Sequence, residues 1–116
     1  MAVAKHFPGI GRTRIDSHLD LPVFKDVPTA MEAVELPPFT AAMQAGVGAV
    51  MLSHILYEKI DGRWPASLSP AIARDLLRGR FGYQGVVITD DLDMGAIKRH
   101  FDIRTVIRQI MAAEID

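Results

Sequence analysis

Two short motifs carry the side chains whose types and spacing could support proton transfer or nucleophilic attack. The first is Asp16-Ser17-His18. In extended chain, residues two apart point to the same side, so the Asp16 carboxylate can hold one N–H of the His18 ring. A histidine oriented in this way suits general acid–base catalysis near neutral pH. The alternative is a polar loop in which Asp16 forms a turn with nearby backbone and His18 is merely exposed.

The second motif, Asp90-Asp91, comes directly after the apolar run Gly85–Thr89. A carboxylate at the end of a buried strand is well placed for catalysis in α/β barrels, where it could attack a sugar C1 as a nucleophile. Asp is also a good helix N-cap, so the pair could instead begin a helix. Both interpretations can hold together, with Asp90 taking part in the chemistry and Asp91 capping the helix.

Three further residues could contact a ligand beside these motifs. Lys5-His6 ends the first apolar run, and His54 follows the second. Ammonium and imidazole groups donate hydrogen bonds to hydroxyl-rich or anionic ligands, so we assign Lys5, His6 and His54 to substrate binding. The alternative is a lysine that points into solvent and histidines that are hydrogen-bonded in the core. His6, His18, His54 and Asp90 lack a recognised metal-ligand spacing, so the sequence predicts neither a metal nor a cofactor.

Apolar, β-branched runs predict the strands that would position these residues: Met1–Phe7, Val47–Ser53 and Gly85–Thr89. Their lack of polar alternation is typical of a parallel sheet that is covered on both faces. Helical patterns lie between and after the strands, at Glu35–Gly46, from Ser69 to about Arg80, and after Asp102. Alternating strands and helices indicate an α/β fold whose strands are parallel and whose long loops gather at one edge.

The loops Pro8–Val34 and His54–Leu68 are long enough to indicate a function. Three strands would leave two unpaired sheet edges, which is unusual for a complete domain. We therefore interpret residues 1–116 as one incomplete domain, the middle of a larger α/β sheet or barrel.

The composition excludes several classes of partner. The 116 residues carry a formal net charge of −1 and no cysteine, and no basic cluster indicates a nucleic acid. No apolar run approaches the roughly 18 residues that a membrane span needs. The Gly9-Ile10-Gly11 run lacks the third glycine of a dinucleotide-binding loop. The sequence therefore predicts a globular protein with no nucleic-acid partner and no membrane span.

Taken together, these stretches resemble glycoside hydrolase family 3, most closely its β-N-acetylhexosaminidase branch. The resemblance is collinear over nearly the whole chain and is carried by Lys5–Gly9, Asp16–His18, Leu21-Pro22, Glu35-Leu36, Pro38-Phe39, Ala45-Gly46, Val50-Met51, His54-Ile55, Pro65–Ser69, Gly85–Leu92 and Met94–Ile97. It implies about three βα units of a (β/α)8 TIM-type barrel, and a retaining glycosidase that needs no cofactor. One departure is Ile10, which stands where many relatives have a second histidine.

The resemblance also implies a role for each matching residue. Asp90 matches the nucleophile, His18 the general acid/base and Asp16 its partner, while Lys5 and His6 match the pair that binds sugar hydroxyls. The implied reaction is hydrolysis of terminal, non-reducing β-N-acetylglucosaminides. For this branch the resemblance implies a substrate that is often a peptidoglycan-derived muropeptide, and a cytoplasmic site in Gram-negative bacteria.

Finally, the resemblance implies that the chain holds only strands five to seven of the barrel. We therefore expect the isolated chain to be inactive. The alternative is a non-catalytic barrel fragment that is stabilised as a homo-oligomer through its exposed strand edges.

Overall fold

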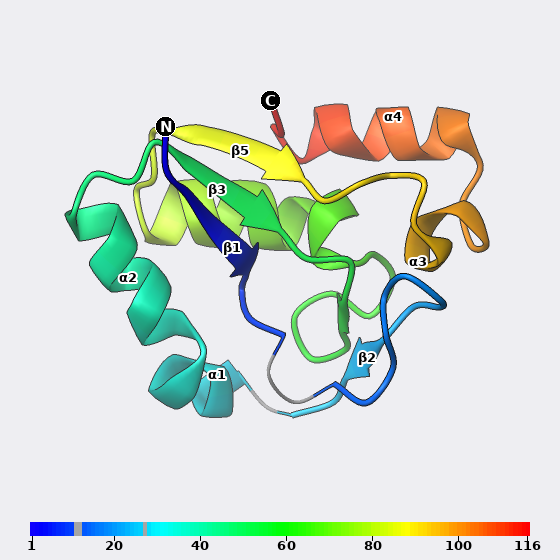
Figure 1. Ribbon diagram of the computed structural model, residues 1–116, viewed down its shortest axis with the longest axis horizontal. Coiled ribbons are helices and arrows are strands. Elements are labelled where there is room, and N and C mark those ends of the chain that lie inside the picture. Colours follow the sequence, from blue (N-terminus) through cyan, green and yellow to red (C-terminus); the bar gives the residue numbers. More distant parts are fainter. Residues whose placement is uncertain (11–12, 27) are drawn as a thin grey trace.

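A three-stranded parallel sheet lies at the centre of the computed structural model, which describes residues 1–10, 13–26 and 28–116. Its strands are β1 (Val3–Phe7), β3 (Ala49–Leu52) and β5 (Val86–Thr89), and their order in the sheet is β1-β3-β5. Figure 1 shows that the three arrows point the same way. The α/β class, the three strands and their parallel direction are therefore confirmed.

The strand register places the ends of the three strands side by side. Leu52 of β3 pairs with Phe7 of β1 on one side and with Thr89 of β5 on the other. The β1–β3 register shifts between Lys5 and Phe7, next to His6. The residues that leave the strands therefore start from a common edge of the sheet.

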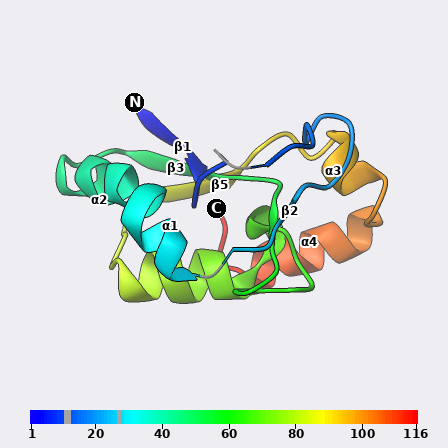
Figure 2. The same ribbon diagram turned by 90° about the horizontal axis from the view of Figure 1, so that it is seen from below.

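Helices connect and follow the strands. Two helices, α1 (Pro28–Val34) and α2 (Leu36–Gln44), separate β1 from β3. A short 3₁₀ turn, η1 (Ala66–Leu68), and a widely wound helix, η2 (Ala71–Arg80), separate β3 from β5. After β5 come α3 (Gly95–Lys98) and α4 (Ile103–Ala112). Figure 2 shows η2, coloured lime green, and α4 on the same side of the sheet.

The predicted helix boundaries correspond to local hydrogen-bonding signals. Gly46 has φ +79° directly after α2, and the amides of Gly46 and Val47 donate to the carbonyls of Met43 and Ala42, which forms a Schellman stop. The Ser69 hydroxyl accepts the amide of Ile72 at 3.2 Å, at the start of η2. The predicted stop at Gly46 and the predicted start at Ser69 are thus confirmed.

Some elements differ from the predicted long loops. The segment expected to be a loop after β1 contains α1 and a short strand, β2 (Val23–Phe24). The loop after β3 contains β4 (Leu56–Tyr57), which pairs with β2 in parallel. Two-residue strands leave no periodic pattern, so sequence reasoning could not find them. Residues 11 and 12 of the glycine-containing loop that we excluded as a dinucleotide site lie outside the described residues.

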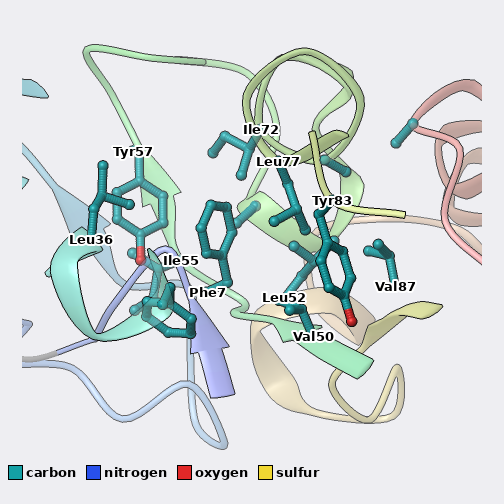
Figure 3. Close-up of a cluster of buried hydrophobic side chains, with 14 of the residues drawn as sticks. Phe7, Leu36, Val50, Leu52, Ile55, Tyr57, Ile72, Leu77, Tyr83 and Val87 are labelled. Carbon is teal, nitrogen blue, oxygen red and sulfur yellow. The ribbon is translucent and has the colours of Figure 1, made fainter. Parts of the chain in front are cut away.

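The hydrophobic core lies between the sheet and η2. It includes Phe7 of β1, Leu52 of β3, Val87 of β5 and Leu77 of η2, none of which has measurable exposure. Figure 3 shows how side chains from the strands meet those of η2 in this cluster. The Phe7 ring packs edge-on against Phe39 of α2, with 5.2 Å between ring centroids. The core therefore holds the three strands in place at the residues next to their carboxyl ends.

No helix in the described part of the chain is long and apolar enough to cross a membrane.

Candidate active site

A cavity of about 320 Å³ opens beyond the carboxyl ends of the three central strands. Five of the six predicted site residues line it: His6, Asp16, His18, His54 and Asp90. They come from the end of β1, from the loop between β1 and β2, from the segment after β3 and from the end of β5. Parallel strands bring their carboxyl ends to one edge, which is why residues so distant in sequence meet here.

Asp90 lies at the end of β5, and two of its bonds fix its position. Its amide donates to the carbonyl of Leu52 at 3.3 Å, and its Oδ1 accepts the Asp91 amide at 2.8 Å. Its other oxygen, Oδ2, lies 3.3 Å from Nε2 of His6. The side chains of Asp90 and His6 are each 24% exposed, so both remain reachable from the cavity. A carboxylate held in this way can present one oxygen to a ligand.

Asp16 and His18 form the predicted carboxylate–imidazole pair. Nδ1 of His18 lies 2.7 Å from Oδ1 of Asp16, and the His18 amide donates to the same oxygen at 2.9 Å. The backbone bond first, and the side-chain bond second, lower the pKa of Asp16 below its ordinary value. An ionised carboxylate can only accept, so Nδ1 carries the proton and Nε2 is the nitrogen that can exchange one. The pair therefore has the form of an oriented general acid/base.

The loop that carries this pair is seated on α3. The amides of Gly95 and Ala96 donate to the carbonyls of His18 and Ser17, at 3.2 and 3.1 Å. A Cβ atom on Gly95 would lie 2.6 Å from the carbonyl oxygen of Leu19, closer than such atoms approach. Glycine is therefore required for this contact. Sequence reasoning missed it, because a glycine that permits close approach has no local signature.

A second link joins the same loop to the segment that follows α3. Asp20 and His100 are 2.6 Å apart, measured from Oδ1 to Nε2. The bond to His100 is the main cause that lowers the pKa of Asp20. Both side chains are substantially exposed, so the pair is expected to contribute little to overall stability. No local sequence pattern pairs residues that lie 80 positions apart.

His54 occupies a different environment from the other site histidines, because its side chain lies in the core. The residue is 1% exposed. Its Nδ1 is 2.7 Å from the Ser67 hydroxyl, and its Nε2 is 2.8 Å from the carbonyl oxygen of Asp91. Burial lowers the pKa of His54, which favours the neutral ring. The predicted contact between His54 and substrate stays a prediction.

A buried tyrosine ties the start of the loop that carries Asp16 and His18 to the segment after β3. The Tyr57 hydroxyl donates to the Gly9 carbonyl. A carbonyl only accepts, so the Ser53 hydroxyl, 3.1 Å away, donates to the Tyr57 oxygen. Burial raises the pKa of Tyr57, which keeps the hydroxyl protonated. This contact fixes Gly9, the residue at which the loop leaves the strand edge.

Lys5 is the one predicted site residue that does not line the cavity. Its side chain is exposed, and its predicted sugar contact stays a prediction. Among residues 1–10, 13–26 and 28–116, no group of three or more histidine and acidic side chains could hold a metal ion.

Known proteins match the chain in both sequence and structure. The model of the glycosyl hydrolase family 3 N terminal domain matches residues 1–116. A β-hexosaminidase from Stenotrophomonas maltophilia (strain K279a) is 41% identical over 95 residues, which are 82% of this chain and 28% of that protein.

Two solved structures share the arrangement of elements. A family 3 β-N-acetylglucosaminidase from Paenibacillus sp. superposes with a TM-score of 0.94 at 40% identity, over 98% of this chain and 22% of that one. NagZ from Neisseria gonorrhoeae, in complex with N-trifluoroacetyl-D-glucosamine, superposes with a TM-score of 0.84 at 34% identity, over 98% of this chain and 32% of that one. The chain therefore spans well under half the length of these proteins.

Proposed function

Because the chain belongs to the glycosyl hydrolase family 3 N terminal domain family, we propose that it supplies the catalytic residues of a retaining β-N-acetylhexosaminidase. One observation carries the proposal: a carboxylate at the end of β5 and an oriented carboxylate–imidazole pair line the same cavity. A retaining mechanism needs a nucleophile and an acid/base on the two sides of the glycosidic bond. The substrate class follows the similar proteins, which are β-hexosaminidases and β-N-acetylglucosaminidases.

The proposed reaction has two steps. Asp90 attacks the anomeric carbon with one carboxylate oxygen, while protonated His18 gives its Nε2 proton to the departing glycosidic oxygen. This step forms a glycosyl ester on Asp90 and a neutral His18 ring. Neutral His18 then removes a proton from water, the water oxygen attacks the same carbon, and the ester bond breaks to return the Asp90 carboxylate.

Three other residues assist this reaction in the proposal. Asp16 holds Nδ1 of His18, so that proton exchange occurs at Nε2. His6, beside Asp90, and Lys5, the preceding residue of the same strand, bind sugar hydroxyls. The resemblance, and not the geometry, supports the contact with Lys5.

A chimera tests the proposal, because the chain spans 28% of the Stenotrophomonas β-hexosaminidase. Residues 1–116 would replace the matching stretch of that enzyme, and release of the aryl group from an aryl β-N-acetylglucosaminide would be followed. We expect turnover in the chimera and its loss in Asp90→Ala. Asp93→Ala is a matched control, because Asp93 lies in the same turn and its carboxylate pairs with Lys98. Near-normal turnover in Asp90→Ala would refute the nucleophile assignment.

We further propose that the isolated chain is an inactive barrel fragment containing the strands that correspond to strands five to seven. A specific observation favours the alternative in which copies of it associate. Apolar side chains are exposed along α4, namely Ile103, Ile107 and Met111, and on the two outer strands, namely Val3 and Val86. Hydrolysis and mass in solution, measured together, test both ideas. An active monomer would contradict the fragment proposal, and an inactive oligomer would support the alternative.

The resemblance also carries two narrower proposals, a peptidoglycan-derived substrate and a cytoplasmic site of action. Turnover of a peptidoglycan fragment with terminal β-N-acetylglucosamine, compared with a chitin-derived disaccharide, tests the first. Cell fractionation tests the second. A preference for the chitin disaccharide, or recovery outside the cytoplasm, would contradict them.

A further inference from the structure

His54 links the buried core to the end of β5 through both of its ring nitrogens. The Ser67 hydroxyl and the Asp91 carbonyl are its two partners. We propose that His54 is a positioning residue for the nucleophile: it holds residue 91 from the core, and residue 91 fixes the Asp90 carboxylate. This inference rests on the function proposed above, and it gives His54 a role other than contact with the sugar.

The partners of His54 determine its tautomer. The Asp91 carbonyl can only accept a hydrogen bond, so Nε2 of His54 must carry a proton and donate it. Nδ1 of the neutral ring is then an acceptor, and the Ser67 hydroxyl donates to it. Ser67 is itself completely buried, so water cannot substitute for either partner without a rearrangement. The donors are therefore fixed along this chain of hydrogen bonds: the Ser67 hydroxyl donates to His54, and His54 donates to the Asp91 carbonyl.

The chain of bonds continues from Asp91 to the nucleophile. The Asp91 amide donates to Oδ1 of Asp90 at 2.8 Å. Residue 91 is thus held at its carbonyl by His54 and offers its amide to Asp90. The Asp91 carbonyl also accepts the Met94 amide at 3.2 Å, so loss of His54 would loosen residue 91 without leaving its carbonyl unpaired. With Oδ1 occupied, Oδ2 is the oxygen that lies toward His6.

Burial and charge both favour this role over acid–base catalysis by His54. The charged and titratable groups that act on the ring are the carboxylates of Asp90 and Asp91, which favour the imidazolium, and His6, which opposes it. Burial outweighs the carboxylates and lowers the pKa. At 1% exposure, and with both nitrogens bonded, a neutral His54 has no nitrogen left to offer a substrate.

Two substitutions separate the two ends of the ring. Glutamine places an N–H donor near the position of Nε2, so His54→Gln should keep the bond to Asp91. Asparagine reaches only the position of Nδ1, so His54→Asn should keep the bond to Ser67 and lose the bond to Asp91. In the chimera we expect kcat within about threefold of the parent for His54→Gln and about tenfold to hundredfold lower for His54→Asn, with little change in KM.

Nuclear magnetic resonance of the 116-residue chain supplies a readout that does not depend on hydrolysis. We expect the His54 ring to be the neutral Nε2–H tautomer. We also expect the Asp91 amide resonance to shift in His54→Asn and to stay in place in His54→Gln. Ser67→Ala, which keeps the imidazole but removes its core partner, should shift the same resonance if His54→Asn does not fold.

Each outcome decides the proposal. An Nδ1–H tautomer, or an Asp91 amide unaffected by His54→Asn or by Ser67→Ala, would overturn it. A rise in KM in both His54 variants, with kcat unchanged, would overturn it in favour of direct sugar contact. Equal thermal destabilisation of both variants at unchanged kcat would indicate a purely structural histidine. If the unsubstituted chimera folds but does not hydrolyse substrate, the proposed function fails, while the amide shifts still test the hydrogen-bond chain.

Discussion

Replacing Gly95 by alanine should release the loop that carries Asp16 and His18 while leaving the fold intact. The added Cβ atom would lie 2.6 and 2.8 Å from the carbonyl oxygens of Leu19 and His18, so the loop must move away from α3. Movement breaks the two bonds that the amides of Gly95 and Ala96 donate to it. At roughly 0.5–1.5 kcal/mol each, these bonds are together equivalent to about a 5- to 150-fold change in the ratio of seated to released loop.

The same substitution should have a small effect on global stability. Alanine favours a helical position over glycine by roughly 0.5–1 kcal/mol, which offsets part of the lost docking energy. Gly79→Ala is the matched control, because Gly79 lies inside η2 and its added Cβ atom would meet only the Arg74 carbonyl at an ordinary 3.4 Å. We expect the control to stabilise the chain slightly and to leave the loop in place.

Amide hydrogen exchange and hydrolysis together measure this effect. In Gly95→Ala, hydrogen exchange of the Ala96 amide should accelerate by about 5- to 150-fold, the change worked out above for loop release. Turnover by the chimera should fall, because His18 leaves the cavity that it shares with Asp90. Gly79→Ala should change neither measurement. Unchanged exchange at Ala96 in Gly95→Ala would refute the steric argument. Faster exchange with unchanged turnover would refute the assumption that the seated loop is the productive one.

Two further predictions concern stability. Tyr57→Phe removes the donor to the partly buried Gly9 carbonyl and leaves the Ser53 hydroxyl without its acceptor, so the free energy of unfolding in urea should fall by about 1–3 kcal/mol; an unchanged value would contradict the assigned bond. His54, whose pKa is lowered by burial, binds its proton more readily in the unfolded chain than in the folded one. The contribution of His54 to the free energy of unfolding should therefore be constant above pH 6.5 and should fall as the pH drops below that value. The slope should be at most about 1.4 kcal/mol per pH unit, and it should be absent in His54→Gln.

Sequence reasoning succeeded where the cause of a structure is local. Gly46 ends α2 because a glycine can adopt positive φ, and Asp102 begins α4 because its carboxylate accepts the Thr105 amide at 3.1 Å. The apolar runs predicted the strands, and parallel strands predicted a common edge for their ends. The cavity lined by His6, His18 and Asp90 follows from that topology.

The features that sequence reasoning missed depend on contacts between segments that are distant in the chain, and residue spacing does not encode such contacts. The two-residue strands β2 and β4 are visible only once they pair. Gly95 looks like an ordinary glycine until the backbone of Leu19 approaches it. For His54, the residue type indicated hydrogen bonding, and both a sugar contact and a core role were open. Its burial and its two partners were not accessible from the sequence.

The pairing of β2 with β4 has a consequence for how the loop between Gly9 and Pro22 could change. One end of the loop is fixed at Gly9 by Tyr57, and the other at Pro22, whose carbonyl accepts the Leu56 amide. Both anchors therefore belong to one short segment, Leu56-Tyr57, which holds the two ends of the loop close together. Doubling the length of a loop whose ends are held together costs only about 0.6 kcal/mol of closure entropy. The loop could thus be lengthened or changed in sequence to fit a bulkier ligand, while its two anchors and the sheet edge stay as they are.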